Sequence, residues 1–201
     1  MGLRERKKAE TRTALSWAAI RLAVERGYAE VRVEDIAEAA GVSPRTFNNY
    51  FSSKAEAIVA RNTDRVRGIA AALREHPAEP LWDAITRAVT THFAPDAESA
   101  AHPLPDAEQW TAGVRLMLAE PAVQGEMLRA QAAAEAEIAA AVAERTGADP
   151  DRDLRPHLVA AAVTAAIGTA TAHHLRTEPP SPMAPLLTEA LHGFATGLAT
   201  P

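Results

Sequence analysis

The segment EDIAEAAGVSPRTFNNYFSSK, residues 34–54, constrains the fold of this chain more than any other feature. It reads as a short amphipathic helix that ends at Gly41, and then as a second helix that Ser43 caps and Pro44 begins. Acidic residues in the first turn of the earlier helix suit its dipole. Two helices joined by a glycine turn in this way are typical of a helix-turn-helix.

The second helix of this pair has two different faces when its residues are spaced by 100°. Phe47, Phe51 and Lys54 fall within about 60° of one another. The two phenylalanines are therefore expected to pack on Ile36 and on the helix before it.

The opposite face carries an arginine and two asparagines, Arg45, Asn48 and Asn49. Arginine can bond to O6 and N7 of guanine, and asparagine to N6 and N7 of adenine. This face is therefore suited to the major groove of double-stranded DNA, although an ordinary surface helix would also be polar here.

Four further residues of the segment are better placed for phosphates than for bases. They are Ser43, Thr46, Tyr50 and Lys54. A basic run upstream, residues 4–8 and then Arg12, would form an N-terminal arm that follows phosphates or enters the minor groove. A frayed, solvated terminus is the alternative interpretation.

The chain of 201 residues is rich in alanine, is 47% hydrophobic and has few β-branched runs, which favours an all-α fold of about nine helices. Besides the pair in 33–54, the apolar spacing predicts helices over 8–26, 54–76, 81–93, 106–119, 121–145, 154–176 and 185–198. A loop is expected over 94–105.

Prolines near residue 77 predict three parts: a helix-turn-helix domain at 1–53, a connecting helix at 54–76, and a larger helical domain at 77–201. Residues 1–76 hold 14 Lys and Arg against 10 Asp and Glu, a net +4. The remaining 7 against 16 give −9, which together make the total of −5. Only the N-terminal part is therefore expected to meet a polyanion.

Several classes of protein are disfavoured. No apolar run is expected to reach the roughly 20 residues that span a bilayer, and no signal sequence opens the chain, so a cytoplasmic protein without membrane contact is expected. The chain has no cysteine, and it lacks a phosphate-binding glycine loop or a nucleophile–base signature. We therefore expect neither an enzyme nor a cofactor. Adjacent His173 and His174 diverge on a helix, and the other histidines lack ligand spacing, which argues against a metal site.

Residues 11–58 resemble the DNA-binding domain of the tetracycline-repressor (TetR) family. The matching residues are Thr11-Arg12, Ala18-Ala19, Leu22, Glu25-Arg26-Gly27-Tyr28, Val33-Glu34-Asp35-Ile36-Ala37, Gly41-Val42-Ser43, Thr46-Phe47, Phe51, Ser53-Lys54 and Ala57. The resemblance implies a homodimeric repressor with three N-terminal helices for DNA and a helical body for a small-molecule effector.

The chain departs from the family pattern in three places. Arg32 stands where the family usually has threonine, so the first helix of the pair loses a side-chain cap and gains a candidate phosphate contact. Asn48 and Tyr50 stand where tyrosine and histidine are frequent, so the preferred bases should differ. Ala23 replaces a common aromatic residue, whose volume Trp17 could fill.

The last two predicted helices carry an apolar seam that suits a four-helix interface between two copies. The proposed interface residues are Val163, Ile167, His174, Leu187, Leu191, Phe194 and Leu198. An intramolecular core would show the same pattern.

Large apolar residues with few polar ones are the candidates for an effector pocket, which would suit a hydrophobic or amphipathic molecule. They are Trp82, Phe93, Trp110, Met117, Met127 and His173. Filling of the core is the competing role for each of them.

The sequence thus predicts a repressor that binds a palindromic operator as a homodimer and that an effector releases. The alternatives are an activator or ligand-independent regulator of the same fold, and a helical protein-interaction module with a degenerate DNA domain.

Overall fold

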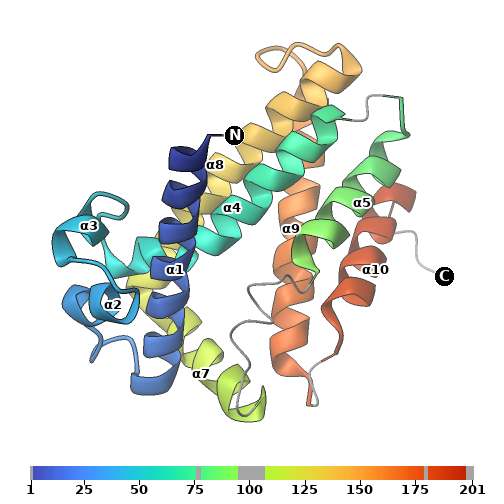
Figure 1. Ribbon diagram of the computed structural model, residues 1–201. Helices are drawn as coiled ribbons and strands as arrows, with labels where there is room; N and C mark the ends of the chain where they lie inside the picture. The colour runs from blue at the N-terminus through green and yellow to red at the C-terminus, as the bar shows by residue number, and fades with distance from the viewer. Residues whose placement is uncertain (1, 76–77, 95–106, 179–180, 198–201) are drawn as a thin grey trace. The chain divides into compact units, whose positions relative to one another are not determined.

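The computed structural model describes residues 2–75, 78–94, 107–178 and 181–197 (Figure 1). Within these ranges all regular structure is helical, which confirms the all-α prediction. The helices are α1 (Leu3–Arg26), α2 (Val33–Ala39), α3 (Pro44–Asn48), α4 (Lys54–Glu75), α5 (Leu81–Phe93), α7 (Ala107–Ala119), α8 (Pro121–Thr146), α9 (Leu154–Arg176) and α10 (Met183–Thr196).

The predicted bounds agree with the structure to within two residues except at the start of α1. That helix begins at Leu3 instead of residue 8, because residues 3–7 contain no helix breaker and Glu5 lies in the first turn, where the dipole favours it. α10 begins at Met183 and ends before Gly197, which takes the left-handed conformation. The predicted loop over 94–105 and Leu198 lie almost wholly outside the described residues.

The chain divides into two compact units that differ from the three parts expected from sequence. The first unit comprises Met1–Asn62 and Leu104–Ala130, and the second comprises Thr63–Pro103 and Gln131–Pro201. α4 and α8 therefore each contribute residues to both units.

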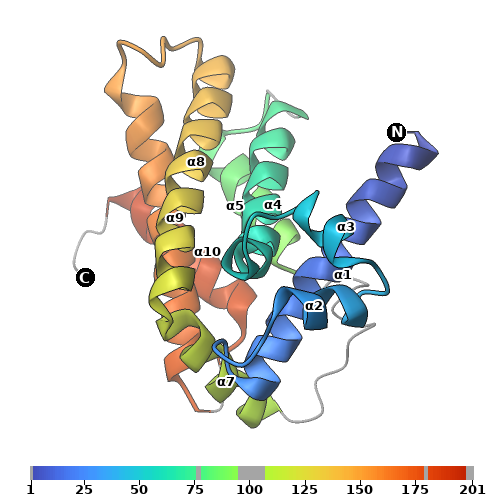
Figure 2. The ribbon, with the colours of Figure 1, turned by 90° about the vertical axis from the view of Figure 1, so that its left-hand side faces the viewer.

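The first unit has a core to which α7 and the beginning of α8 contribute as well as the N-terminal helices. Leu15, Ile36, Phe47 and Phe51 are buried in this core, and Val123 from α8 lies in the same cluster. Both ribbon views show α2 and α3 packed beside α1 (Figures 1 and 2). Ser16 on α1 donates its hydroxyl hydrogen to the carbonyl of Ala57, with 2.6 Å between the oxygens, which ties α1 to α4.

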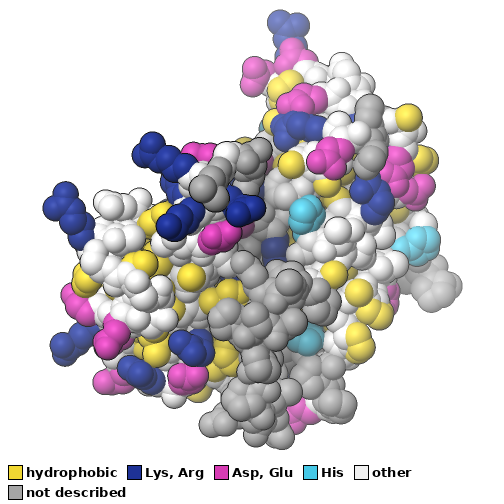
Figure 3. Space-filling view, viewed as in Figure 1, with side chains coloured by type: hydrophobic (Ala, Val, Ile, Leu, Met, Phe, Trp, Pro, Cys, Tyr) yellow, Lys and Arg dark blue, Asp and Glu magenta, His cyan; other side chains and the backbone are white. Residues whose placement is uncertain are grey.

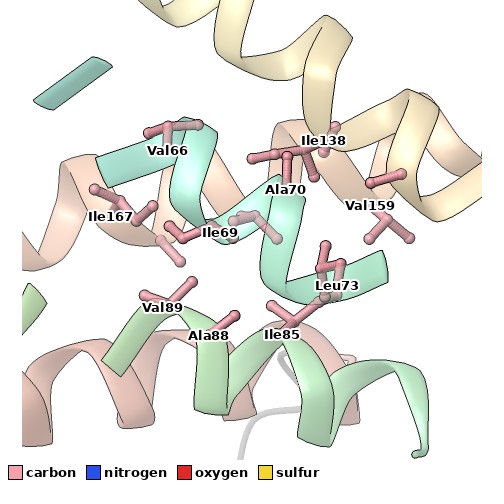
Figure 4. Packing of buried hydrophobic residues seen from close by; sticks show 14 of the residues in the cluster. Val66, Ile69, Ala70, Leu73, Ile85, Ala88, Val89, Ile138, Val159 and Ile167 are labelled. Atoms are coloured by element: carbon pink, nitrogen blue, oxygen red, sulfur yellow. The ribbon is translucent and has the colours of Figure 1, made fainter. Parts of the chain in front are cut away.

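The second unit buries one apolar cluster between the second part of α4, α5, α8, α9 and α10. Ile69 and Leu73 from α4 meet Ile85 and Val89 from α5, while Ile138 of α8 and the α9 residues approach from the other side (Figure 4). α10 packs on both α9 and α5. This unit therefore gains its stability from helices that are far apart in sequence.

Ion pairs join α4 to α8 on the outside of the second unit. The guanidinium of Arg74 contacts both carboxylate oxygens of Glu144, at 2.6 and 3.0 Å, and lowers the pKa of that carboxyl. About two helical turns earlier on each helix, Arg67 contacts Glu137. Arg145 donates to the carbonyls of Leu73 and Glu79, so it occupies acceptors at the end of α4 and beyond it.

α9 is long and apolar enough to cross a membrane on length and composition, so the expectation that no run is long enough was wrong. The composition has a structural cause, because Val159, Val163 and Ile167 lie in the core of the second unit. Alanine and glycine make up much of the rest of the helix.

A glycine on α7 permits close contact with α1 in the first unit. A Cβ atom at Gly113 would lie 2.6 Å from Cγ1 and 2.9 Å from the carbonyl oxygen of Val24. Gly113→Ala should therefore lower the free energy of unfolding by about 1–3 kcal/mol, the usual cost of overpacking. Urea unfolding measures the change.

Gly125 on α8 is the matched control, because a Cβ there would meet no atom closer than Arg129 Nη1 at 4.0 Å. Gly125→Ala should leave stability unchanged or raise it by about 0.5–1 kcal/mol. Equal effects of the two substitutions would contradict the close contact of α7 with α1.

Candidate nucleic-acid interface

The helix-turn-helix has the caps that its sequence predicts. The backbone N–H of Arg32 donates to Oδ2 of Asp35 at 2.8 Å, so a carboxylate reaching back from α2 replaces the missing side-chain cap. Gly41 turns the chain with φ at 68°, a conformation that favours glycine. Ser43 Oγ accepts the N–H of Thr46 at 3.1 Å, which confirms the predicted cap of α3.

α3 is anchored by two aromatic rings. Phe47 and Phe51 are 0% and 1% exposed, and their ring centres are 5.7 Å apart with planes tilted by 52°. Both rings belong to the core that contains Ile36 and Leu15, as the helical angles predict. Any tilt of α3 would expose these rings, so the anchor fixes which way the rest of the helix points.

The polar face of α3 lies toward solvent. Arg45, Asn48 and Asn49 are all exposed. Regular α-helix ends at Asn48, and Asn49 caps it in the right-handed region while its N–H bonds to the carbonyls of Arg45 and Thr46. Arg45 forms no salt bridge with any residue that the structure describes. Three groups that can bond to base edges are therefore held on one short, capped and anchored helix.

The other residues predicted near α3 are less free. Ser43 Oγ and Thr46 Oγ1 are 2.9 Å apart and bond to each other, and Thr46 is half-buried. Tyr50 is half-buried beside Phe51, with ring centres 6.5 Å apart. Arg32 has an exposed side chain before α2.

Lys54 has a different environment from the one predicted. It is the first residue of α4, whereas α3 ends at Asn48 and holds only Phe47 of the two phenylalanines. Its Nζ donates to the carbonyls of Tyr28 and Val31, at 2.6 and 2.8 Å, and lies 4.1 Å from the centre of the Tyr28 ring. Two of the three ammonium donors of Lys54 thus hold the link between α1 and α2, and its phosphate contact stays a prediction.

Comparison with known proteins identifies the family. Residues 17–60 match the model of bacterial regulatory proteins of the tetR family, and residues 79–199 match the MftR C-terminal domain. The chain is 33% identical over 168 residues to the HTH-type transcriptional regulator TcmR of Streptomyces glaucescens, covering 80% of this chain and 71% of that protein. The chain belongs to the TetR family of transcriptional regulators.

Solved structures show the same fold for this TetR-family regulator. The fatty acid degradation regulator FadR of Bacillus halodurans superposes with a TM-score of 0.59 at 16% identity, over 95% of this chain and 97% of that one. FadR of Thermus thermophilus, solved in complex with lauroyl-CoA, gives 0.54 at 19% identity, over 94% and 96%. DNA binding and transcription regulation are functions of the family that the tetR-family model and the TcmR relative identify.

The residues predicted for an effector pocket are divided between the two units of this TetR-family regulator. Trp110, Met117 and Met127 belong to the first unit, and Trp82, Phe93 and His173 to the second. Met117 is 5% exposed in the core of the first unit, so it fills that core.

The other candidates of the second unit differ in burial. Trp82 and Phe93 pack half-buried against the second core, and the guanidinium carbon of Arg65 lies 5.1 Å from the centre of the Phe93 ring. His173 is exposed on α9 and is not enclosed in this unit.

A groove of about 530 Å³ lies between α5 and α10 in the second unit. Its lining residues are Trp82, Asp83, Thr86, Arg87, Thr90, Thr188, His192 and Ala195. Arg87 is held by Glu79 at 2.8 Å, and the hydroxyls of Thr90 and Thr188 donate to backbone carbonyls of their own helices. This lining is more polar than the pocket expected for an apolar effector.

The predicted dimer seam is largely intramolecular. Val163, Ile167, Leu187 and Leu191 are 0–6% exposed in the core of the second unit, so they cannot meet a second copy.

The remaining seam residues also have partners within the chain or lie outside its described part. Phe194 packs half-buried against the same core. His174 Nδ1 lies 2.7 Å from the carbonyl oxygen of Ser181. Leu198 is outside the described residues. The seam prediction is therefore wrong for its buried residues, because a core and an interface have the same apolar period.

Groups of three or more His, Asp or Glu side chains suited to a metal ion do not occur among the residues that the structure describes.

Replacement of Lys54 tests the role that the structure gives it. Lys54→Met keeps the aliphatic stem but leaves two partly buried carbonyls without their donor, which should lower the free energy of unfolding by about 1–3 kcal/mol. Arg45→Met, at an exposed position of the same domain, should change it by less than about 0.5 kcal/mol. Urea unfolding measures the free energy of unfolding of both variants. An unchanged value for Lys54→Met would contradict a stabilising role of the hydrogen bonds that Lys54 donates.

Proposed function

We propose that this regulator is a repressor that binds a palindromic operator as a homodimer and that a hydrophobic or amphipathic small molecule releases. The observation that carries the proposal is the exposed set of Arg45, Asn48 and Asn49 on a helix anchored by Phe47 and Phe51. Side chains of these types read guanine and adenine in the major groove.

Phosphate contacts would hold this helix in register without reading sequence. Ser43, Thr46 and Tyr50 lie on or beside α3, and Arg32 precedes α2 with its side chain exposed. The positive charge of residues 1–76 favours contact of this part of the chain with DNA.

The exposed side of α9 is the surface that best fits a second copy of the chain. Leu158 is 59% exposed, and Ala161, Ala165, Gly168 and Ala172 follow it at helical spacing on the same exposed face. No charged residue occurs between Leu158 and Ala172. A Cβ atom at Gly168 would meet nothing within 4 Å, so the face has room for another helix.

A two-fold dimer presents the same surface twice and brings two recognition helices to one duplex. Half-sites read by such dimers lie roughly 34–36 Å apart or at multiples of that distance. An effector that binds better to a conformation with a different spacing of the two recognition helices would shift the population toward that conformation. α4 contributes to both units, so a change of α4 would alter that spacing.

The chemistry of the effector is suggested by the fold relatives. The lauroyl-CoA of the Thermus thermophilus FadR complex is amphipathic, as is the molecule expected from the apolar candidates of this chain. Lauroyl-CoA is therefore the first probe for release of the bound duplex, with free coenzyme A as the control for its polar part.

Selection of bound duplexes from a random-sequence library tests the proposed function. A regulator of this kind should enrich a palindrome with guanine or adenine at the positions that α3 reads. Failure to enrich any palindrome would favour a protein-interaction module with a degenerate DNA domain. Enrichment without release by any effector would favour a ligand-independent regulator.

Arg45→Ala should weaken binding to the selected palindrome by about 1–3 kcal/mol and relax the preference at one base pair per half-site. The loss is local, because Arg45 is exposed and does not support the fold. Competition gel shifts with duplexes changed at single positions measure both effects. Undiminished discrimination by the variant would remove Arg45 from the base-reading set.

Ala165→Glu should dissociate the dimer, because it places an unpaired charge within a closed helix interface at a cost of about 3–5 kcal/mol. Ala71→Glu, on an exposed position of α4, is the control of equal charge. Sedimentation velocity reports the oligomeric state of both. A dimer that survives the first substitution would place the interface elsewhere.

A further inference from the structure

The first turns of α1 carry a face of positive charge that the base-reading helix does not use. At 100° per residue, Arg4, Lys7, Lys8 and Arg12 fall within an arc of about 140°. Arg6 and Glu10 fall on the opposite side of the helix and pair with each other at 3.6 Å. We call the first four residues the basic face of α1.

Three of the four charges of this face have no salt-bridge partner among the described residues. Arg4, Lys7 and Lys8 are exposed, and none of them forms a salt bridge with a residue in the described part of the chain. Figure 3 shows Lys and Arg side chains projecting around the start of α1. The positive charges of Arg4, Lys7 and Lys8 repel one another, so binding of a polyanion to this face would be favoured.

Arg12 shows on which side of the first unit the basic face lies. Its guanidinium carbon lies 4.7 Å from the centre of the Phe51 ring, directly over the anchor of α3. The basic face therefore begins beside the recognition helix and continues along α1 toward Arg4.

We propose that the basic face of α1 binds the DNA phosphate backbone beside the half-site that α3 reads. The proposal rests on the DNA-binding function proposed above and extends its contact surface. The helix rises by about 12 Å over the eight steps from Arg4 to Arg12. At 3.4 Å per nucleotide along one strand, this length corresponds to about three or four phosphates.

The helical conformation decides between the two roles considered for the N-terminal segment. An α-helix is about 10–12 Å wide with its side chains, whereas the minor groove is about 6 Å wide. Because α1 is helical from Leu3, this segment lies along phosphates and does not enter the minor groove.

A triple variant tests the basic face on the palindromic duplex selected by the wild-type protein. Arg4→Gln, Lys7→Gln and Lys8→Gln together should lower the slope of log K against log salt by about 2.7, since each phosphate contact contributes about 0.9. The loss of affinity should then be roughly 40-fold greater at 50 mM than at 200 mM salt. Hydroxyl-radical footprints should lose protection over about three to four consecutive nucleotides.

The matched control removes the same charge from other positions of α1. Arg6, Arg21 and Arg26 are exposed and are replaced together by glutamine. This control should keep the footprint and most of the slope. Equal slopes and footprints for the two triple variants would overturn the basic face while leaving base reading intact.

Arg45→Ala separates this proposal from the proposed function. If it relaxes sequence preference while the triple variant acts like the control, only the basic face fails. If the wild-type protein selects no duplex at all, both proposals fail together.

Discussion

The orientation of α3 depends on the burial of Phe47 and Phe51. Water is excluded from both rings, and the remaining polar groups of this short helix are thereby directed outward. α3 has only five residues of regular helix, too few to be stable alone. The conformation of the residues proposed to read bases therefore depends on the core beneath them.

That core is not made by the N-terminal helices alone. Met117 and Val123 from α7 and α8 lie in the same cluster as Phe47, and Gly113 brings α7 against the backbone of α1. Two hydrogen bonds tie this core to α4. Ser16 of α1 donates to the carbonyl of Ala57, and Lys54 donates to the carbonyl of Tyr28 between α1 and α2. α2 and α3 thus share their supporting core with α7 and α8, two helices that begin 32 and 46 residues after the end of α4 at Glu75.

Much of this arrangement could be predicted from the sequence, because caps, glycines and apolar periods are local signals. Ser43, Pro44 and Gly41 fixed α3, and periodicity located α5 and α9. The role of Lys54 could not be predicted, because its acceptors are backbone carbonyls of a link more than twenty residues away. Leu187 and Leu191 were assigned to an interface because the helical period cannot distinguish a neighbour in the same chain from one in a second copy.

Methylation interference on the selected duplex is the most direct measurement of base reading by α3. Methyl groups on guanine N7 block a bidentate arginine, so one guanine in each half-site should interfere with wild-type binding. The same guanine should be neutral for the Arg45→Ala protein. Identical interference patterns for the two proteins would show that the outward face of α3 does not read that base.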